Sequence, residues 1–116
     1  MPDPNCLFCK IAAKQIPSAI VFEDDAVVAF RDIAPQAPVH IVLVPRAHCS
    51  GLDVLTADLA PVVGRIALVA RDLAASEGIA ASGYRLVSNC GADAGQTIHH
   101  LHFHLLGGKP MGVRLA

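Results

Sequence analysis

Six residues near the C-terminal end of the chain, His100-Leu101-His102-Phe103-His104-Leu105, alternate strictly between polar and apolar side chains. A β-strand sends successive side chains to opposite faces of a sheet. The pattern therefore predicts one strand, which we place at residues 97–106, with three imidazoles on one face and the apolar side chains packed under a helix on the other. The apolar face fixes the register, because a slip of one residue would expose it and bury the imidazoles.

Six further segments have the periodicity or composition of regular elements. They are a short helix at 7–15, strands at 20–23, 27–31, 39–44 and 84–89, and one long helix from about Asp58 to about Glu77. Gly78, which follows the long helix, is a residue type common at helix C-termini. Short strands around one long helix indicate an α+β fold with a largely antiparallel sheet. We expect residues 1–116 to form one domain, because no repeat, low-complexity tract or linker divides the chain.

The composition excludes several classes of protein. With 53% hydrophobic and 16% charged residues, a chain of 116 residues folds around its own core. A formal net charge of −1, the lack of a basic run and an aromatic content of four Phe, one Tyr and no Trp exclude a nucleic-acid polymer as partner. Apolar runs are too short to span a bilayer, so we expect no membrane partner. Residues 1–5 lack the basic and apolar regions of a secretory signal, which predicts a cytoplasmic protein with reduced thiols.

The face with three imidazoles has three possible interpretations. It is a solvated strand face, a catalytic zinc site in which His-x-His supplies two ligands, or a site of nucleophilic catalysis at phosphorus. In the third, one neutral imidazole attacks while its neighbours hold the phosphate oxygens. The preceding loop favours this third interpretation, because it offers backbone N–H groups and a hydroxyl where a phosphate would lie. The loop residues concerned are Gly91, Gly95, Gln96 and Thr97.

Cys6 and Cys9 have the C-x₂-C spacing of half a zinc site or of a thiol redox pair. The redox interpretation requires a βαβ context that the predicted elements lack. Zinc requires two more ligands, for which His48 and a histidine at the start of the predicted last strand are candidates. Two buried free thiols are the alternative. Cys49 and Cys90 have no ligand spacing and are interpreted as small buried or partly exposed residues.

Residues 95–106, GQTIHHLHFHLL, resemble the signature of the histidine triad (HIT) superfamily, in which three histidines alternate with apolar residues. Five further segments resemble, in order, its branch of nucleoside phosphoramidases and related nucleotide hydrolases: 16–18, 22–25, 32–40, 44–48 and Asn89. The resemblance covers nearly the whole chain. It implies the HIT fold, an antiparallel sheet of about five strands with one long and one short helix. It also implies a homodimer that pairs two sheet edges, with a contribution from residues 62–73.

The resemblance further implies a reaction, the hydrolysis of purine nucleoside 5′-phosphoramidates of the AMP-NH₂ or AMP-lysine type through a covalent His-nucleotide intermediate. His102 is then the nucleophile, and His40 supports it by a hydrogen bond to its other ring nitrogen. His104 and Gln96 contact the phosphate, together with backbone donors of residues 95–97. The implied catalytic set is His100, His102, His104 and His40.

A substrate site and a structural zinc site follow from the same resemblance. Asp32 matches the acidic residue on the ribose hydroxyls, although it could equally cap a turn before Pro35. The other implied substrate-binding residues are Leu7, Phe8, Ile11, Phe30, Ile33, Val42, Asn89, Gly95, Gln96 and Thr97, with plain core packing as the alternative for the apolar ones. Several bacterial members bind zinc at positions that correspond to Cys6, Cys9, His48 and His100, with His99 as the alternative to His100. No metal is obligatory for the reaction itself.

Two other functions stay open at this stage. One is the hydrolysis of dinucleoside polyphosphates, and the other is a zinc-stabilised nucleotide-binding adaptor whose turnover is incidental. Members of the phosphoramidase branch often have an aromatic tail after the Gly-Gly pair, whereas residues 109–116 contain no aromatic side chain. Because that tail sets leaving-group preference in the family, the leaving group stays open as well.

Overall fold

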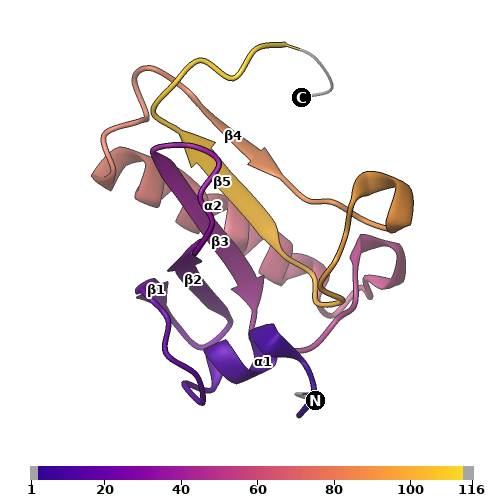
Figure 1. Cartoon of the computed structure of the whole chain (residues 1–116). Helices are drawn as coiled ribbons and strands as arrows, with labels where there is room; N and C mark the ends of the chain where they lie inside the picture. Colours follow the sequence, from indigo (N-terminus) through magenta and orange to yellow (C-terminus); the bar gives the residue numbers. More distant parts are fainter. Residues whose placement is uncertain (1–2, 114–116) are drawn as a thin grey trace.

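One antiparallel sheet of five strands forms the body of the structure, a computed structural model that describes residues 3–113 (Figure 1). Its elements are α1 (Leu7–Ala12), β1 (Ile20–Glu23), β2 (Val27–Arg31), β3 (Val39–Pro45), η1 (Leu52–Val54), α2 (Ala60–Ser76), β4 (Tyr84–Val87), η2 (Ala92–Ala94) and β5 (Phe103–Gly107). Residues 1–2, part of the segment inspected for a secretory signal, and residues 114–116, part of the C-terminal tail, lie outside the described range. None of the helices formed by residues 3–113 is long and apolar enough to cross a membrane.

The strand order β1-β2-β3-β5-β4 places β3 in the middle of the sheet. The segment β3 is almost entirely apolar, as expected of a strand that is covered on both faces. The last strand, β5, pairs with β3 on one side and with β4 on the other, so that His104 lies opposite Val42 of β3 and Val87 of β4. The end of the chain that carries the histidines therefore inserts next to the most buried strand.

The two faces of the sheet are covered by different helices, with α2 behind the sheet and α1 in front of it in Figure 1. Alternate residues of β2, β3 and β5 pack against α2 and form the larger core: Val27, Ala29, Ile41, Leu43 and Leu105, together with Ile66, Val69, Ala70 and Leu73 of the helix. The opposite face carries Val28, Phe30, Val42 and Val44, which pack against α1. Arg46 fixes the C-terminal end of α1, because its guanidinium donates to the carbonyl oxygen of Ala12 at 2.9 Å.

The sequence predicted most element positions correctly. The strands at 20–23 and 27–31 coincide with β1 and β2, and the prediction of an α+β fold with about five strands is confirmed. The long helix begins at Ala60 with Pro61 in its first turn, where a proline is tolerated.

The prediction of a continuous strand at residues 97–106 is wrong, because β5 begins only at Phe103. Residues 97–102 approach the segment that follows β3, where the Leu101 N–H donates to the Cys49 carbonyl oxygen at 2.6 Å. The His100 imidazole is fully buried, although the alternation predicted it on an open face. It can be buried because both ring nitrogens have partners, the Pro45 carbonyl oxygen at Nε2 and cysteine sulfur at Nδ1. A period-2 pattern cannot reveal such partners.

We predict that truncation of the core beneath β3 lowers the free energy of unfolding substantially. Leu43 is fully buried between the sheet and α2, so Leu43→Ala should cost about 2–5 kcal/mol in a urea denaturation experiment. Leu52→Ala, which removes a side chain of the same type that is 39% exposed, should cost less than about 1 kcal/mol. Equal losses for the two variants would contradict this assignment of the core.

Candidate functional site

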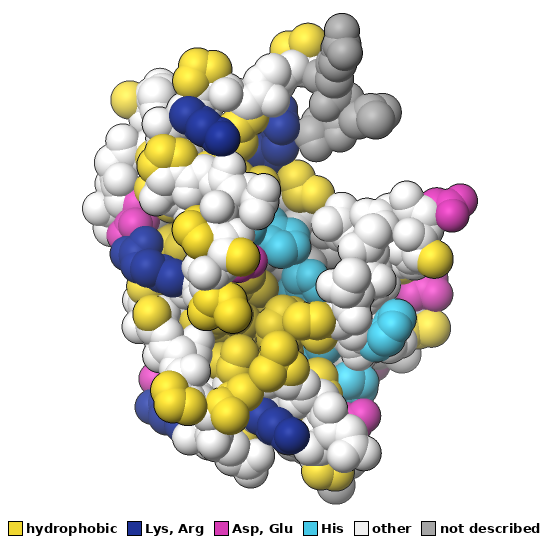
Figure 2. All heavy atoms as spheres, viewed as in Figure 1, with side chains coloured by type: hydrophobic (Ala, Val, Ile, Leu, Met, Phe, Trp, Pro, Cys, Tyr) yellow, Lys and Arg dark blue, Asp and Glu magenta, His cyan; other side chains and the backbone are white. Residues whose placement is uncertain are grey.

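A cavity of about 730 Å³ opens on the face of the sheet that carries α1. Figure 2 shows imidazoles gathered beside hydrophobic side chains on this face. Of the predicted catalytic histidines, His40, His102 and His104 line the cavity. All of the predicted substrate-binding residues except Gln96 line it as well: Leu7, Phe8, Ile11, Phe30, Asp32, Ile33, Val42, Asn89, Gly95 and Thr97. The structure thus brings together residues from α1, β2, β3, β5 and the loops that follow β2 and β4.

The orientation of the His102 ring is set by a backbone carbonyl. Its Nδ1 lies 2.7 Å from the carbonyl oxygen of His100. A carbonyl oxygen can only accept, so Nδ1 carries the proton, and in the neutral ring Nε2 holds the free lone pair. The ring is 7% exposed and lines the cavity, with the edge of Phe8 packed against it at a centroid distance of 5.0 Å. The arrangement can present a nucleophilic Nε2 to a ligand in the cavity.

His40 and His104 are joined in a hydrogen-bonded series that fixes both tautomers. The backbone N–H of Gln36 donates to His40 Nδ1 at 3.0 Å, so the neutral His40 ring carries its proton on Nε2. His40 Nε2 lies 2.8 Å from His104 Nδ1 and 3.4 Å from an oxygen of Asp32. Since His104 Nδ1 accepts this proton, the neutral His104 ring carries its own proton on Nε2. The series therefore provides one ordered donor beside His102.

This series corrects one expectation from the sequence. His40 was expected to bond the second ring nitrogen of His102, but it contacts His104 instead. The partner of His102 Nδ1 is a main-chain oxygen, and the partner of His40 Nδ1 is a main-chain N–H. Backbone groups occur at every residue, so no sequence signal could have identified these two contacts.

Burial keeps the paired imidazoles neutral. Desolvation lowers the pKa of His104 to about 4, and the neighbouring rings of His102 and His40 act in the same direction, while Asp32 opposes them. The pKa of His40 is also lowered, because its burial outweighs the attraction of Asp32. Near pH 7 the site therefore offers hydrogen-bond donors without a permanent positive charge on these two rings.

Asp32, His40 and His104 could also be interpreted as a metal site, because their ligand atoms lie within 4.8 Å of one another. The tautomer of His40 argues against a metal ion. Its Nδ1 accepts from Gln36, so its Nε2 is protonated and has no lone pair for an ion. We therefore interpret this cluster as a hydrogen-bonded relay.

Gln96 does not reach the cavity, contrary to the expectation that it contacts the phosphate. Its side-chain oxygen accepts from the Gly91 N–H at 2.9 Å, and its amide nitrogen donates to the carbonyl oxygens of Ser50 and Ile98. Gln96 thus holds the 91–96 loop against the segment after β3. The backbone N–H groups of Gly95 and Gln96 also donate within this loop, which leaves Thr97 as the cavity-lining candidate among the predicted phosphate donors.

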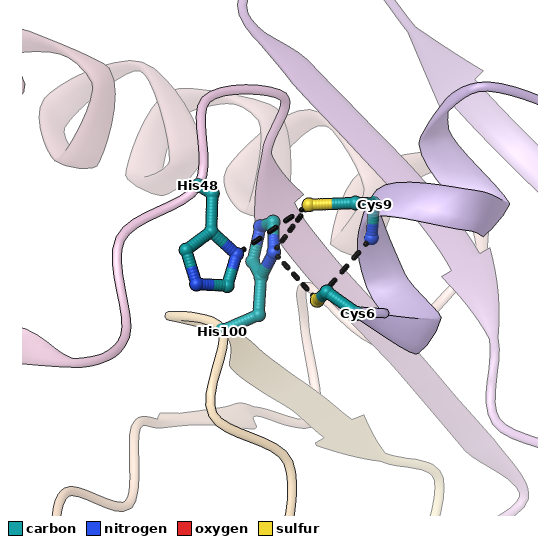
Figure 3. Close-up of side chains that lie close together, drawn as sticks. All are labelled: Cys6, Cys9, His48 and His100. Atoms are coloured by element: carbon teal, nitrogen blue, oxygen red, sulfur yellow. Dashed lines mark hydrogen bonds between the residues drawn. The ribbon is translucent and has the colours of Figure 1, made fainter. Parts of the chain in front are cut away.

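A second cluster, formed by Cys6, Cys9, His48 and His100, lies beside the cavity (Figure 3). Cys6 Sγ lies 3.3 Å and Cys9 Sγ 3.5 Å from His100 Nδ1, and Cys9 Sγ lies 3.4 Å from His48 Nδ1. All four ligand atoms lie within 4.8 Å of one another. A tetrahedral ion with these donor types separates its ligand atoms by roughly 3.3–3.8 Å. The cluster therefore fits a metal ion in both donor chemistry and spacing.

His100, rather than His99, is the histidine of this cluster. His99 is exposed, whereas His100 is fully buried with Nε2 2.8 Å from the Pro45 carbonyl oxygen. This contact places the proton on Nε2 and leaves Nδ1 free to bind an ion, a common arrangement for histidine ligands. Burial lowers the pKa of His100 to about 4, so the ring is in the neutral form that ligates metals.

Comparison with known proteins agrees with the fold and the site. The HIT domain family matches residues 13–111, and the chain belongs to this family. It is 46% identical to purine nucleoside phosphoramidase of Escherichia coli over 110 residues, which cover 95% of this chain and 92% of that protein. An uncharacterized HIT-like protein of Synechococcus elongatus is 47% identical over 107 residues, covering 92% of this chain and 93% of that protein.

Solved structures of HIT family proteins share the fold of this chain. A HIT family hydrolase from Clostridium thermocellum superimposes with a TM-score of 0.95 and 44% identity, covering 98% of this chain and 99% of that chain. A HIT family hydrolase from Legionella pneumophila gives a TM-score of 0.93 and 44% identity, covering 97% of this chain and 100% of that chain.

We predict that His104 makes the folded protein sensitive to mild acid. Its pKa is about 4 in the folded state against about 6.5 in an unfolded chain. The stability that comes with a neutral His104 is fully present above pH 6.5 and is lost as the pH falls towards 4, because the unfolded chain takes up the proton first. His104→Gln should therefore take up about one proton fewer on unfolding in this window, so that its free energy of unfolding falls less steeply with falling pH than that of the wild type, as measured by urea denaturation at several pH values.

His99→Gln is the matched control, because His99 is exposed. It should follow the wild-type pH dependence. The cysteine–histidine cluster is the same in all three proteins, so its own acid sensitivity cancels in the comparison. If the curve of His104→Gln ran parallel to that of the wild type, the assignment of a neutral, buried His104 would be refuted.

Proposed function

We propose that this protein hydrolyses purine nucleoside 5′-phosphoramidates through a covalent intermediate on His102. The observation that carries the proposal is the 2.7 Å contact of His102 Nδ1 with the His100 carbonyl oxygen, which leaves Nε2 as the unprotonated nitrogen of a ring that lines the cavity. The relative at 46% identity is a purine nucleoside phosphoramidase, which supports the same substrate class.

The reaction proceeds in two displacements at phosphorus. His102 Nε2 attacks the phosphorus, an Nε2–P bond forms and the P–N bond breaks; the leaving nitrogen keeps the electron pair of that bond, takes up one proton from the solvent and departs as the amine. Positive charge develops on the attacking ring, and the His100 carbonyl oxygen at Nδ1 stabilises it. Water then attacks the phosphorus, the Nε2–P bond breaks and the nucleoside monophosphate leaves. The sum is phosphoramidate plus water to monophosphate plus amine.

His104 stabilises the charge on the phosphoryl oxygens. The relay from Gln36 through His40 orders its Nε2 as a donor, and its lowered pKa keeps the ring neutral before the substrate binds. A donor that is already oriented costs little reorganisation when charge develops in the transition state. The proposed steps use protein groups alone and need no metal ion.

The apolar part of the cavity suits a planar base. Ile33 is fully exposed and Leu7 is 45% exposed at the cavity, although both are large apolar side chains that would gain from being covered. Asp32 also lines the cavity, next to Ile33 in the chain and with one carboxylate oxygen 3.4 Å from His40 Nε2. One of its oxygens accepts from the Ala34 N–H at 2.8 Å, as a turn cap does, and the carboxylate still has acceptor capacity for ribose hydroxyls.

We infer that the ion of the cysteine–histidine cluster is zinc in a structural role. Two thiolates and two imidazoles form a closed tetrahedral set of the kind that structural zinc occupies. When bound, zinc supplies a cross-link between α1, the segment after β3 and the segment before β5.

We also propose that the protein is a homodimer. β4 is an edge strand, and an unpaired edge can add a strand from a second copy. Leu68, on the outer side of α2 within residues 62–73, is 45% exposed and is available for the same contact. Sedimentation of wild type against Leu68→Glu should show a dimer that the substitution weakens, and a monomeric wild type at micromolar concentration would contradict the proposal.

The reaction can be tested by trapping the intermediate. Quenched mass spectrometry of the protein mixed with an adenosine phosphoramidate should detect one added adenylyl group, localised to His102. His102→Ala should give no adduct and lose about 10³-fold or more in kcat. The exposed His99 offers a matched control, since His99→Ala should retain both adduct and turnover.

The other outcomes distinguish the alternatives. Turnover without an adduct in the wild type would indicate direct attack by water. Nucleotide binding without turnover would favour the adaptor, and preferential cleavage of a dinucleoside polyphosphate would favour the other hydrolase activity. Full activity of His102→Ala would refute the proposed mechanism.

A further inference from the structure

His100 belongs to two sites at once. Its side chain is part of the cysteine–histidine cluster, with Nδ1 3.3 Å from Cys6 Sγ and 3.5 Å from Cys9 Sγ. Its backbone carbonyl oxygen is the partner of His102 Nδ1 at 2.7 Å. Because side chain and carbonyl share one Cα, a displacement of the His100 ring from the cluster also displaces the oxygen that selects the tautomer of His102.

The segment before β5 has little regular structure of its own to hold it. The pairing of β5 with β3 extends only to Phe103, so residues 100–102 lie outside this ladder. Their backbone is tied by the Leu101 N–H to the Cys49 carbonyl oxygen, one residue after His48, and by Ser88 Oγ, which donates to the His102 carbonyl oxygen at 2.8 Å. The position of His102 therefore depends on these two hydrogen bonds and on the side-chain contacts of its neighbours, among which those of His100 in the cluster are buried.

The same cluster reaches the opposite wall of the cavity through α1. Cys6 and Cys9 flank Leu7 and Phe8, and both of these intervening residues line the cavity. The Phe8 ring packs edge-on to His102 at 5.0 Å and to His100 at 6.0 Å between centroids. A helix of six residues is too short to be stable without tertiary contacts.

We propose that Cys6, Cys9, His48 and His100, joined through one metal ion, position the catalytic nucleophile as well as stabilise the fold. The cluster holds the His100 carbonyl oxygen against His102 Nδ1 and Phe8 against the ring. In the protein without the ion, His102 samples both neutral tautomers, and the fraction with an unprotonated Nε2 falls. The kinetic part of this inference rests on the proposed function, whereas the tautomer of His102 does not.

The tautomer is measurable without any substrate. Nitrogen NMR of ¹⁵N-histidine-labelled protein, at about pH 8 where imidazoles are neutral, distinguishes protonated from unprotonated ring nitrogens. Zinc-loaded wild type should show His102 with a protonated Nδ1 alone, and chelator-treated protein that is folded by circular dichroism should show both forms. A single, unchanged tautomer in the folded metal-free protein would overturn the proposal.

Substitution of His48 tests the expected loss of kcat, because His48 belongs to the cluster and does not line the cavity. His48→Ala should lower kcat roughly 10- to 100-fold, with a smaller change in KM, and should show the mixed tautomer of His102. His48→Cys restores a fourth ligand, since three cysteines and one histidine also bind zinc, and should recover kcat and the single tautomer. His99→Ala should leave kcat, KM and zinc content unchanged.

The outcomes separate this inference from the proposed function. If the metal-free wild type unfolds, the tautomer is compared between folded His48→Ala, which lacks one ligand, and folded His48→Cys, which regains a fourth. Wild-type kcat in His48→Ala, with the zinc lost and the His102 tautomer unchanged, would refute the positioning role while phosphoramidate hydrolysis still stands. Absence of phosphoramidate turnover in zinc-loaded wild type would refute the proposed function, and the NMR comparison would still decide the inference.

Discussion

The burial of one imidazole, that of His100, is the contact on which the rest of the site depends. A fully buried polar ring is costly unless its nitrogens are satisfied, and here Pro45 accepts from one nitrogen while two thiol sulfurs lie at the other. These partners come from the N-terminal helix and from the end of the central strand. Burial of this ring with its partners therefore brings three segments that are distant in the chain into contact next to the cavity.

Main-chain groups, more than charged side chains, set the electrostatics of the cavity. The His100 carbonyl oxygen holds the proton of His102 on Nδ1, and the Gln36 N–H leaves the proton of His40 on Nε2. The tautomer of His104 follows from that of His40. Burial then keeps the paired rings neutral, as the lowered pKa of His104 shows. A site of this kind offers oriented donors to an anionic group, and it leaves the lone pair of His102 Nε2 free in the neutral ring.

Much of the fold could be predicted from sequence because its signals are local. The hairpin of β1 and β2, the apolar strand β3 and the helix α2 each have a periodicity that a short window reveals. The four members of the cysteine–histidine cluster could be predicted only through the family resemblance, since spacing alone left His99 and His100 open. The strand assignment failed at residues 97–102 because alternation reports which side chains share a face, and not which backbone groups find partners in a sheet.

The sequence by itself determined the elements, the apolar stripes that pack α2 on the sheet, and the residue types available for chemistry. The tertiary structure alone decided which nitrogen of each imidazole carries the proton, because that depends on the backbone group lying opposite. It also decided that Gln96 holds a loop, and that His100 contacts the cysteines through its ring and His102 through its carbonyl oxygen. Some of these contacts join residues far apart in the chain, as the contact of His100 with Cys6 does. The others require only a backbone carbonyl or N–H at the right place, which nearly every residue carries and no sequence pattern marks.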